Sequence, residues 1–181
     1  MRDARALRAL ANPVRLDLLA LLRQNGPRTV GQLSELVGAA PGSVSYHLST
    51  LERSGLVERA PDLARDGRET WWRASHHMTR YEQSEFLGDP ESAAAALAMR
   101  RTVLQRLLAE QLAYLEAEPA LPADWIDAAT SGDTMEYLTA DELRALSADL
   151  EALAARWRRP LDPPRPGTEP VRLIFAAFRR P

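Results

Sequence analysis

The sequence of 181 residues contains no cysteine. Disulfide bonds, thiolate catalysis and thiolate-ligated metal sites are therefore excluded for this chain. Lysine is also absent, so all 23 basic side chains are arginine. No apolar run approaches the roughly 18 residues that cross a bilayer. The first residues form a charge-punctuated, helix-like stretch instead of the apolar core of a signal peptide. We therefore expect no membrane association and take the cytoplasm as the default location.

Charge is distributed unevenly along the chain. Residues 1–80 hold 12 arginines against 8 acids, whereas residues 81–181 hold 11 arginines against 17 acids. The overall net charge of -2 hides this asymmetry. A basic half joined to an acidic half predicts that only the first half contacts a polyanion.

Helix-capping signals divide the first half into short helices. Apolar residues recur at helical spacing from Leu7 to Leu22, and the Asn12-Pro13 pair indicates that a new helix starts there. Thr29 with Gln32 has the form of a capping box, and Gly38 suits the end of the helix that follows.

Two of these predicted helices form a helix-turn-helix. After a link of two alanines, Pro41 opens a helix that runs to Arg53, with Val44, Leu48 and Leu51 on its inward side. Two short helices joined by so brief a link are typical of a helix-turn-helix. Its second helix is the one that enters the major groove of DNA in such motifs.

The pattern changes from helix to strand at Leu56. Residues 56–59 and 69–73 are strand-like, and the polar segment 62–68 between them contains Asp66-Gly67, a turn signal. We expect a hairpin there, called the wing below. Trp71 and Trp72 alternate across the second strand, so one is expected to pack on the core.

The second half predicts more helix and a little sheet. A long helix is expected over 92–118, and a helix capped by Thr139 is expected to reach Arg158. Strands are expected at 134–138 and 171–178, where they would pair into a small satellite sheet, with a proline-rich linker at 160–170. The predicted fold is mainly α with small β: a winged helix-turn-helix domain over 1–78, then a long dimerisation helix and a small α+β part over 79–181.

Polar residues at the start of the 41–53 helix are the candidate DNA-reading residues. Short polar side chains there let base edges come close. The alternative is an ordinary solvated helix face. The predicted set on this helix is Gly42, Ser43, Ser45, Tyr46, Ser49, Thr50 and Arg53. At the wing tip, Arg65 and Arg68 are expected to reach the minor groove or phosphates, unless the loop is merely a solvated turn.

The segment from Leu7 to Arg73 resembles the ArsR family of bacterial winged-helix regulators. The resemblance rests on LRALANPVRL (7–16), VSYHLSTL (44–51), SGLV (54–57) and RDGR (65–68). It covers about two fifths of the chain. It implies a cytoplasmic homodimer that binds operator DNA, often as a repressor relieved by an effector. It also points to Ser43, Ser45, Tyr46 and Ser49 for the groove and to Arg65 and Arg68 for the wing.

The chain departs from the metal-sensing members of that family. Those members carry cysteine pairs or Asp/His sets, and this chain has no cysteine and three histidines, His47, His76 and His77. Adjacent histidines do not share one side of a strand or helix, so His76 and His77 lack the spacing of a chelating pair. We predict no metal site and no cofactor, and we expect His47 to be packed or bonded to the backbone.

A leucine stripe and scattered aromatics characterise the second half. The stripe is most simply a packing face, and the two-fold symmetry of operators favours a second copy as its partner. Aromatic residues there either form plain core or line a pocket for a small apolar effector. The stripe comprises Leu97, Leu104, Leu108, Leu112 and Leu115. The aromatics are Trp125, Tyr137, Trp157, Phe175 and Phe178.

Two other classes of function are alternatives to DNA binding. An enzyme is disfavoured because the sequence has no glycine-rich phosphate loop, no Gly-x-Ser-x-Gly elbow, no His-Glu-x-x-His and no cysteine nucleophile. A ligand-binding or protein-interaction module that uses the winged fold without specific DNA binding stays open, because the whole chain is slightly acidic. Salt dependence separates that module from a DNA binder.

Overall fold

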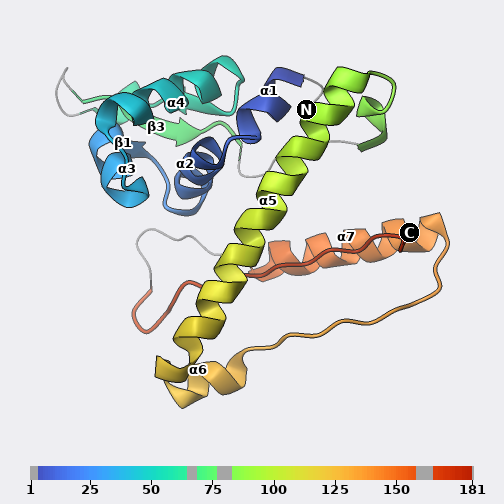
Figure 1. The fold of residues 1–181 in the computed structure, drawn as a ribbon. Coiled ribbons are helices and arrows are strands. Elements are labelled where there is room, and N and C mark those ends of the chain that lie inside the picture. Colours follow the sequence, from blue (N-terminus) through green and yellow to red (C-terminus); the bar gives the residue numbers. More distant parts are fainter. Residues whose placement is uncertain (1–3, 65–68, 77–82, 158–164, 181) are drawn as a thin grey trace. The chain divides into compact units, whose positions relative to one another are not determined.

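The computed structural model describes residues 4–64, 69–76, 83–157 and 165–180. The chain divides into two units, residues 1–109 and 110–181, and each is described by itself. Figure 1 shows that helices dominate and that a small sheet lies within the first unit. The predicted fold class, mainly α with small β, is confirmed.

The first unit contains the helix-turn-helix and the hairpin in the expected order. A long helix, α5, starts in this unit and continues into the second. The elements are α1 (Ala4–Leu10), α2 (Pro13–Gln24), β1 (Arg28–Thr29), α3 (Val30–Val37), α4 (Pro41–Arg53), β2 (Val57–Arg59), a 3₁₀ turn (Pro61–Leu63), β3 (Trp71–Ala74), a second 3₁₀ turn (Gln83–Phe86) and α5 (Pro90–Ala117).

The caps predicted from the sequence start and end these helices. The Asn12 side chain accepts a hydrogen bond from the Arg15 amide at 3.1 Å. Thr29 Oγ1 accepts from the Gln32 amide at 3.3 Å, and Gln32 Oε1 accepts from the Thr29 amide at 2.9 Å. Gly38 ends α3 with φ of 65°, a left-handed conformation that glycine adopts without a Cβ penalty.

The capping box makes a testable contribution to stability. Thr29→Val keeps the side-chain shape but removes the oxygen that accepts from the Gln32 amide. We expect the free energy of unfolding to fall by about 1 kcal/mol in urea denaturation. Thr134→Val is the control, because Thr134 caps no helix and lies in an irregular segment. An equal loss in both variants would contradict the assignment of the effect to the cap.

The sheet has three antiparallel strands in the order β1, β3, β2. The hairpin strands were predicted. The third strand was not, because β1 spans two residues and has no periodicity of its own. Trp72 lies opposite Arg28 on one side and Arg59 on the other, and its ring is buried. This confirms that one of the two tryptophans packs on the core.

One hydrophobic core holds the first unit together. Val44, Leu48 and Leu51 are fully buried, so the inward side predicted for α4 is confirmed. They pack in the same cluster as buried residues of α1, α2, α3, the hairpin, the second 3₁₀ turn and α5, which are Ala6, Leu7, Ala9, Leu10, Leu18, Leu19, Leu22, Leu33, Leu56, Val57, Trp72, Phe86, Ala95, Ala96 and Met99.

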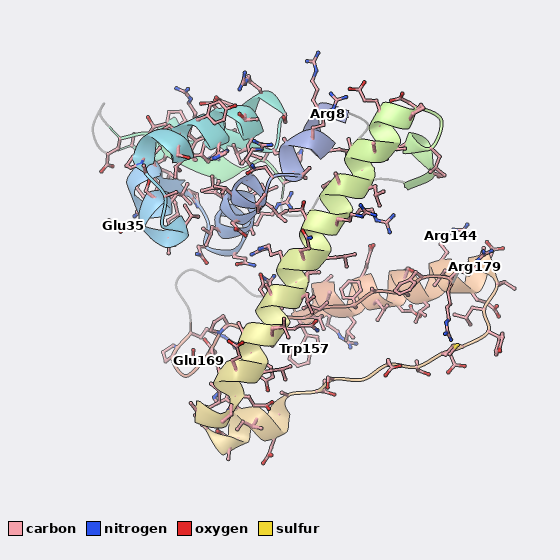
Figure 2. The ribbon with its side chains drawn as sticks, viewed as in Figure 1. Arg8, Glu35, Arg144, Trp157, Glu169 and Arg179 are labelled. Atoms are coloured by element: carbon pink, nitrogen blue, oxygen red, sulfur yellow. The ribbon has the colours of Figure 1, made fainter. Side chains whose placement is uncertain are left out.

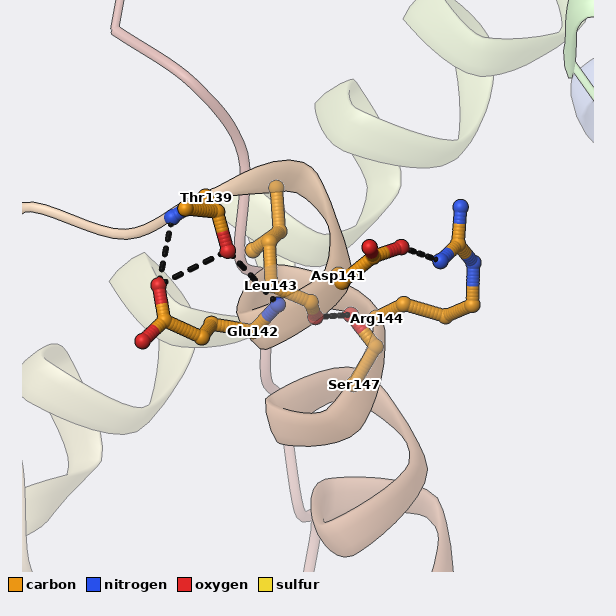
Figure 3. Close-up of polar contacts among 6 residues, drawn as sticks. All are labelled: Thr139, Asp141, Glu142, Leu143, Arg144 and Ser147. Carbon is orange, nitrogen blue, oxygen red and sulfur yellow. Dashed lines mark hydrogen bonds and ion pairs between the residues drawn. The ribbon is translucent and has the colours of Figure 1, made fainter.

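The second unit begins within α5 and adds a 3₁₀ turn (Glu118–Ala120), α6 (Ala123–Ala128) and α7 (Ala140–Trp157). The capping box predicted at Thr139 is present, as Figure 3 shows. Glu142 Oε2 accepts from the Thr139 amide at 2.7 Å, and Thr139 Oγ1 accepts from the Glu142 amide at 3.2 Å. Figure 2 shows Arg144 and Trp157 near opposite ends of α7.

The satellite sheet predicted for the second unit is wrong. Residues 134–138 and 171–178 are both described, and neither forms a strand. The apolar, β-branched pattern was read correctly as non-helical, but a strand exists only when a neighbour accepts its backbone hydrogen bonds. Within this single chain the two segments do not supply that neighbour to each other.

Candidate nucleic-acid interface

Helix α4 presents a polar face on the side opposite its buried residues. Ser43 and Tyr46 are exposed, and 63% of the Tyr46 surface is accessible. Ser45, Ser49 and Thr50 are partly exposed. Because Val44, Leu48 and Leu51 anchor the other side, this face cannot rotate inward without emptying the core.

The start of α4 leaves room for a partner to approach closely. Pro41 is the first helical residue, and the flanking residue, Ala40, has no side chain that could cap the helix. A Cβ added at Gly42 would meet no atom within 4 Å. The first turn therefore ends in free backbone amides and the positive end of the helix dipole, which favour a nearby negative charge.

Hydrogen bonds along the exposed side of α4 fix two of the predicted residues. Thr50 Oγ1 donates to the Tyr46 carbonyl at 3.0 Å. The Arg53 Nε donates to the Ser49 carbonyl at 3.2 Å, and its Nη2 donates to Thr50 Oγ1 at 3.2 Å. These bonds hold the guanidinium against its own helix at an exposed position, so a charged group lies on the polar face.

The base of the wing is held by ion pairs. Arg73 Nε lies 2.7 Å from Glu58 Oε1, and Arg73 Nη1 lies 3.3 Å from Asp62 Oδ2. The hydrogen bond with Glu58 and the charge of Asp62 raise the pKa of Arg73 above its ordinary value. The positive charge of Arg73 is thus balanced by the acidic side chains of the same hairpin. Arg65 and Arg68, the predicted wing contacts, lie outside the described residues.

Sequence reasoning missed the role of Arg15 beneath α4. Its Nε donates to the Ala9 carbonyl at 2.5 Å and its Nη2 to the Arg8 carbonyl at 3.2 Å. Burial lowers the pKa of Arg15, and the nearby Tyr46 partly opposes that shift. Arg15 thereby ties the end of α1 to the start of α2. The N-terminal motif of the family resemblance contains this residue, but only the fold shows what it contacts.

His47 is packed, as the sequence predicted. Its Nδ1 is buried and accepts no hydrogen bond in the described residues. Its ring lies edge-on to Tyr46, with centroids 5.5 Å apart. Burial lowers the pKa of His47, and the positive charge of Arg15 lowers it further.

The pKa of His47 implies a pH dependence of stability. In the unfolded state His47 binds its proton near the ordinary pKa of about 6.5. In the folded state it binds that proton only at a lower pH. The stabilising contribution is therefore complete above that pKa and is lost as the pH falls below it. Between about pH 7.5 and about pH 5.5, we expect the wild type to lose more unfolding free energy than His47→Gln. Parallel losses in urea denaturation would contradict this.

Helix α5 is apolar on two opposite sides. Ala95, Ala96 and Met99 are buried in the core of the first unit. On the same segment, Thr102 Oγ1 donates to the Ala11 carbonyl at 3.2 Å, and Arg106 Nε lies 2.7 Å from Asp17 Oδ1. The opposite side holds the five predicted leucines within an arc of roughly 80°, counted at 100° per residue. All five are exposed: Leu97, Leu104, Leu108, Leu112 and Leu115.

The five aromatics of the second unit are exposed as well. Trp125 is the least accessible, at 37%, and Tyr137 is fully accessible. They therefore do not form plain core within the single chain.

Among the described residues there is neither a candidate metal site nor a candidate membrane span. No group of three or more His, Asp or Glu side chains that could hold a metal ion occurs among them. No helix among them is both long and apolar enough to span a bilayer.

The family-model match to known proteins lies in the first unit of the chain. Residues 10–60 fit a family model described as a helix-turn-helix domain. Over 54 residues the chain is 46% identical to the HTH-type transcriptional regulator NmtR of Mycobacterium tuberculosis. That match covers 30% of this chain and 44% of the regulator, so less than half of the relative is represented. The resemblance to winged helix-turn-helix regulators is confirmed for this part of the chain.

Solved structures overlay only loosely on the whole chain. A mutant MarR from E. coli has a TM-score of 0.33 and 18% identity, over 77% of this chain and 75% of its own. A mutant Lactococcus lactis ZitR in the apo form has a TM-score of 0.33 and 16% identity, over 82% of this chain and 84% of its own. Such loose overlays support no argument about function.

Proposed function

The chain carries a winged helix-turn-helix domain, and on that premise we propose that it is a sequence-specific DNA-binding transcription regulator that acts as a homodimer. Helix α4 enters the major groove of operator DNA, and the wing over 62–68 contacts the adjacent minor groove or phosphates through Arg65 and Arg68. The proposed mode of action is repression, which the family resemblance implies. Because a regulator must reach its operator DNA, we place the protein in the cytoplasm.

The observation that carries the proposal is the polar outer face of α4. Its first two turns offer hydroxyl groups and no acidic side chain, and the core side of the helix is fully buried. Major-groove base edges present donors and acceptors that short hydroxyl side chains can meet. The positive charge of residues 1–80 adds attraction to the phosphates.

The two parts of the chain differ in charge, and we assign them different roles. We assign DNA binding to residues 1–78 and dimerisation to residues 79–181, where the exposed leucines of α5 lie. A two-fold dimer places two recognition helices in successive major grooves, about one helical turn of DNA apart. The exposed aromatics of the second unit leave open the binding of a small apolar effector.

The test is binding to DNA from the chain's own upstream region against a random duplex, across a salt series. We expect specific binding whose affinity falls steeply and linearly on a logarithmic plot against salt. Ser45→Ala and Arg53→Ala should each weaken specific binding by about tenfold, the loss typical of a groove contact. Ser131→Ala, in an irregular segment of the second unit, should leave it unchanged.

The alternative module gives a different result. A ligand-binding or protein-interaction protein with a winged fold would bind both duplexes weakly and equally, or not at all. Either outcome with a folded protein overturns the DNA-binding proposal.

A further inference from the structure

The second unit lacks the buried residues that hold a folded body together. None of its described residues is buried, in α6, in α7 or in the segments around them. The best-covered residues are only half-buried, and in α7 these are Leu143, Ser147, Leu150 and Ala154. Leu146, Leu153 and Trp157 of the same helix are exposed. At 100° per residue these positions form one continuous stripe of roughly 120° along α7, and such a stripe normally faces a core.

Surface area shows how much is left uncovered. The whole chain exposes 13446 Å², whereas two compact bodies of these two lengths would together expose only about 10,500 Å². The surplus of about 3,000 Å², which includes the surface of residues outside the described ranges, is of the order of the roughly 1,000 to 2,500 Å² that each subunit of an obligate homodimer buries.

Two extended segments of this unit have free backbone edges. From Leu173 to Phe178, no backbone amide or carbonyl in the described structure bonds to another backbone group. The same holds from Thr134 to Leu138. The first of these segments is rich in β-branched and aromatic residues. An exposed, apolar, unpaired strand of this kind is a template for pairing with another chain.

The two segments are complementary in charge. Residues 133–138 contain Asp133 and Glu136 and no base, whereas residues 171–180 contain Arg172, Arg179 and Arg180 and no acid. Within one chain, Arg180 Nη1 lies 3.9 Å from the sulfur of Met135. Arg172 pairs with Glu110 of α5, so Arg179 and Arg180 supply the charge complementary to Asp133 and Glu136. Strand alternation gives residues 134–138 one apolar side, with Met135 and Tyr137. Residues 171–178 are apolar on both sides, with Val171, Leu173 and Phe175 on one side and with Ile174 and Phe178 beside Arg172 on the other.

We propose that residues 171–178 of one subunit pair as a β-strand with residues 134–138 of a second copy of this chain. Under two-fold symmetry the exchange occurs twice, so each copy's acidic segment receives the other's basic segment. Pairing supplies backbone partners for Leu173 to Phe178 and for Thr134 to Leu138, which have none in the described structure, and it aligns their apolar sides on one face of the sheet. This inference rests on the proposed homodimer and adds a second interface to the leucine face of α5.

Cysteine cross-linking tests the pairing on the full-length protein, because the chain has no native cysteine. One tagged preparation carries Thr134→Cys, and an untagged one carries Ala176→Cys. The two are unfolded, mixed and refolded together, and are then treated with a short bismaleimide. We expect a covalent dimer that contains both species, at a yield several times that of either preparation alone. Ala113→Cys, at an exposed position on α5, is the matched control in place of Thr134→Cys.

The possible outcomes are distinct. A single chain that carries both cysteines should give covalent dimers in dilute solution, whereas a cross-linked monomer would mean pairing within one chain and would overturn the inference. Dimers formed by Ala176→Cys alone would mean that residues 171–178 pair with themselves, which also overturns it. Operator binding is measured on the same variants. Intact DNA binding without the mixed cross-link rejects only this interface and leaves the proposed function standing.

Discussion

Replacing Ser43 by glutamate is expected to lower operator affinity at least about a hundredfold, because a carboxylate would enter the groove between the phosphates and the acceptor atoms of the bases. The same change should leave the protein as stable as the wild type or slightly more so. Ser43 is the third residue of α4, where a negative side chain interacts favourably with the helix dipole. The opposite signs of the two effects separate a loss of DNA contact from a loss of fold.

The measurements are equilibrium binding to the operator duplex and urea denaturation. Ser131→Glu is the control for net charge, since it adds the same charge at an exposed site in the second unit. It should reduce affinity only slightly. If Ser43→Glu and Ser131→Glu bound equally well, α4 would not be the recognition helix.

Introducing glutamate at both Leu104 and Leu108 is expected to convert the dimer to a monomer at micromolar concentrations. These side chains are 62% and 56% exposed in the single chain and lie opposite the face of α5 that is buried in the core. Burying one leucine contributes about 1.5 to 3 kcal/mol, and a two-fold interface buries each side chain twice. Burying a carboxylate in its place is unfavourable. The dimer dissociation constant should rise at least about a hundredfold.

Analytical ultracentrifugation measures this change. Ala113→Glu is the control, because Ala113 is exposed and lies roughly 140° round α5 from the centre of the leucine face. A double variant that remains dimeric would show that the leucine face is not the interface. A loss of helix signal in circular dichroism would instead indicate misfolding, and the single Leu104→Ser variant then provides a milder test of the same face.

The alternative functions depend on what covers the second unit. Its exposed aromatic side chains suit a protein partner as well as a second copy. If the chain stays monomeric and binds no duplex, a protein-interaction role is favoured instead. A dimer that binds its own upstream DNA would exclude that role as the main one.

The amino-acid sequence by itself determined the local structure of the first unit. Asn12, Thr29 and Gly38 mark helix ends through side-chain and backbone chemistry that acts within three or four residues, so they can be read without the fold. The buried side of α4 also follows from spacing alone, because its apolar positions recur with the period of the helix. The polar face proposed to read DNA is then the remainder of that helix.

The tertiary structure decided everything that depends on a distant partner. Only the fold shows that β1 adds a third strand, that Arg15 binds carbonyl groups of α1, and that α5 is buried on one side and exposed on the other. The strands expected at 134–138 and 171–178 do not form, for the same reason. Propensity describes one segment, whereas a β-strand needs a neighbour, and within one chain that neighbour is missing.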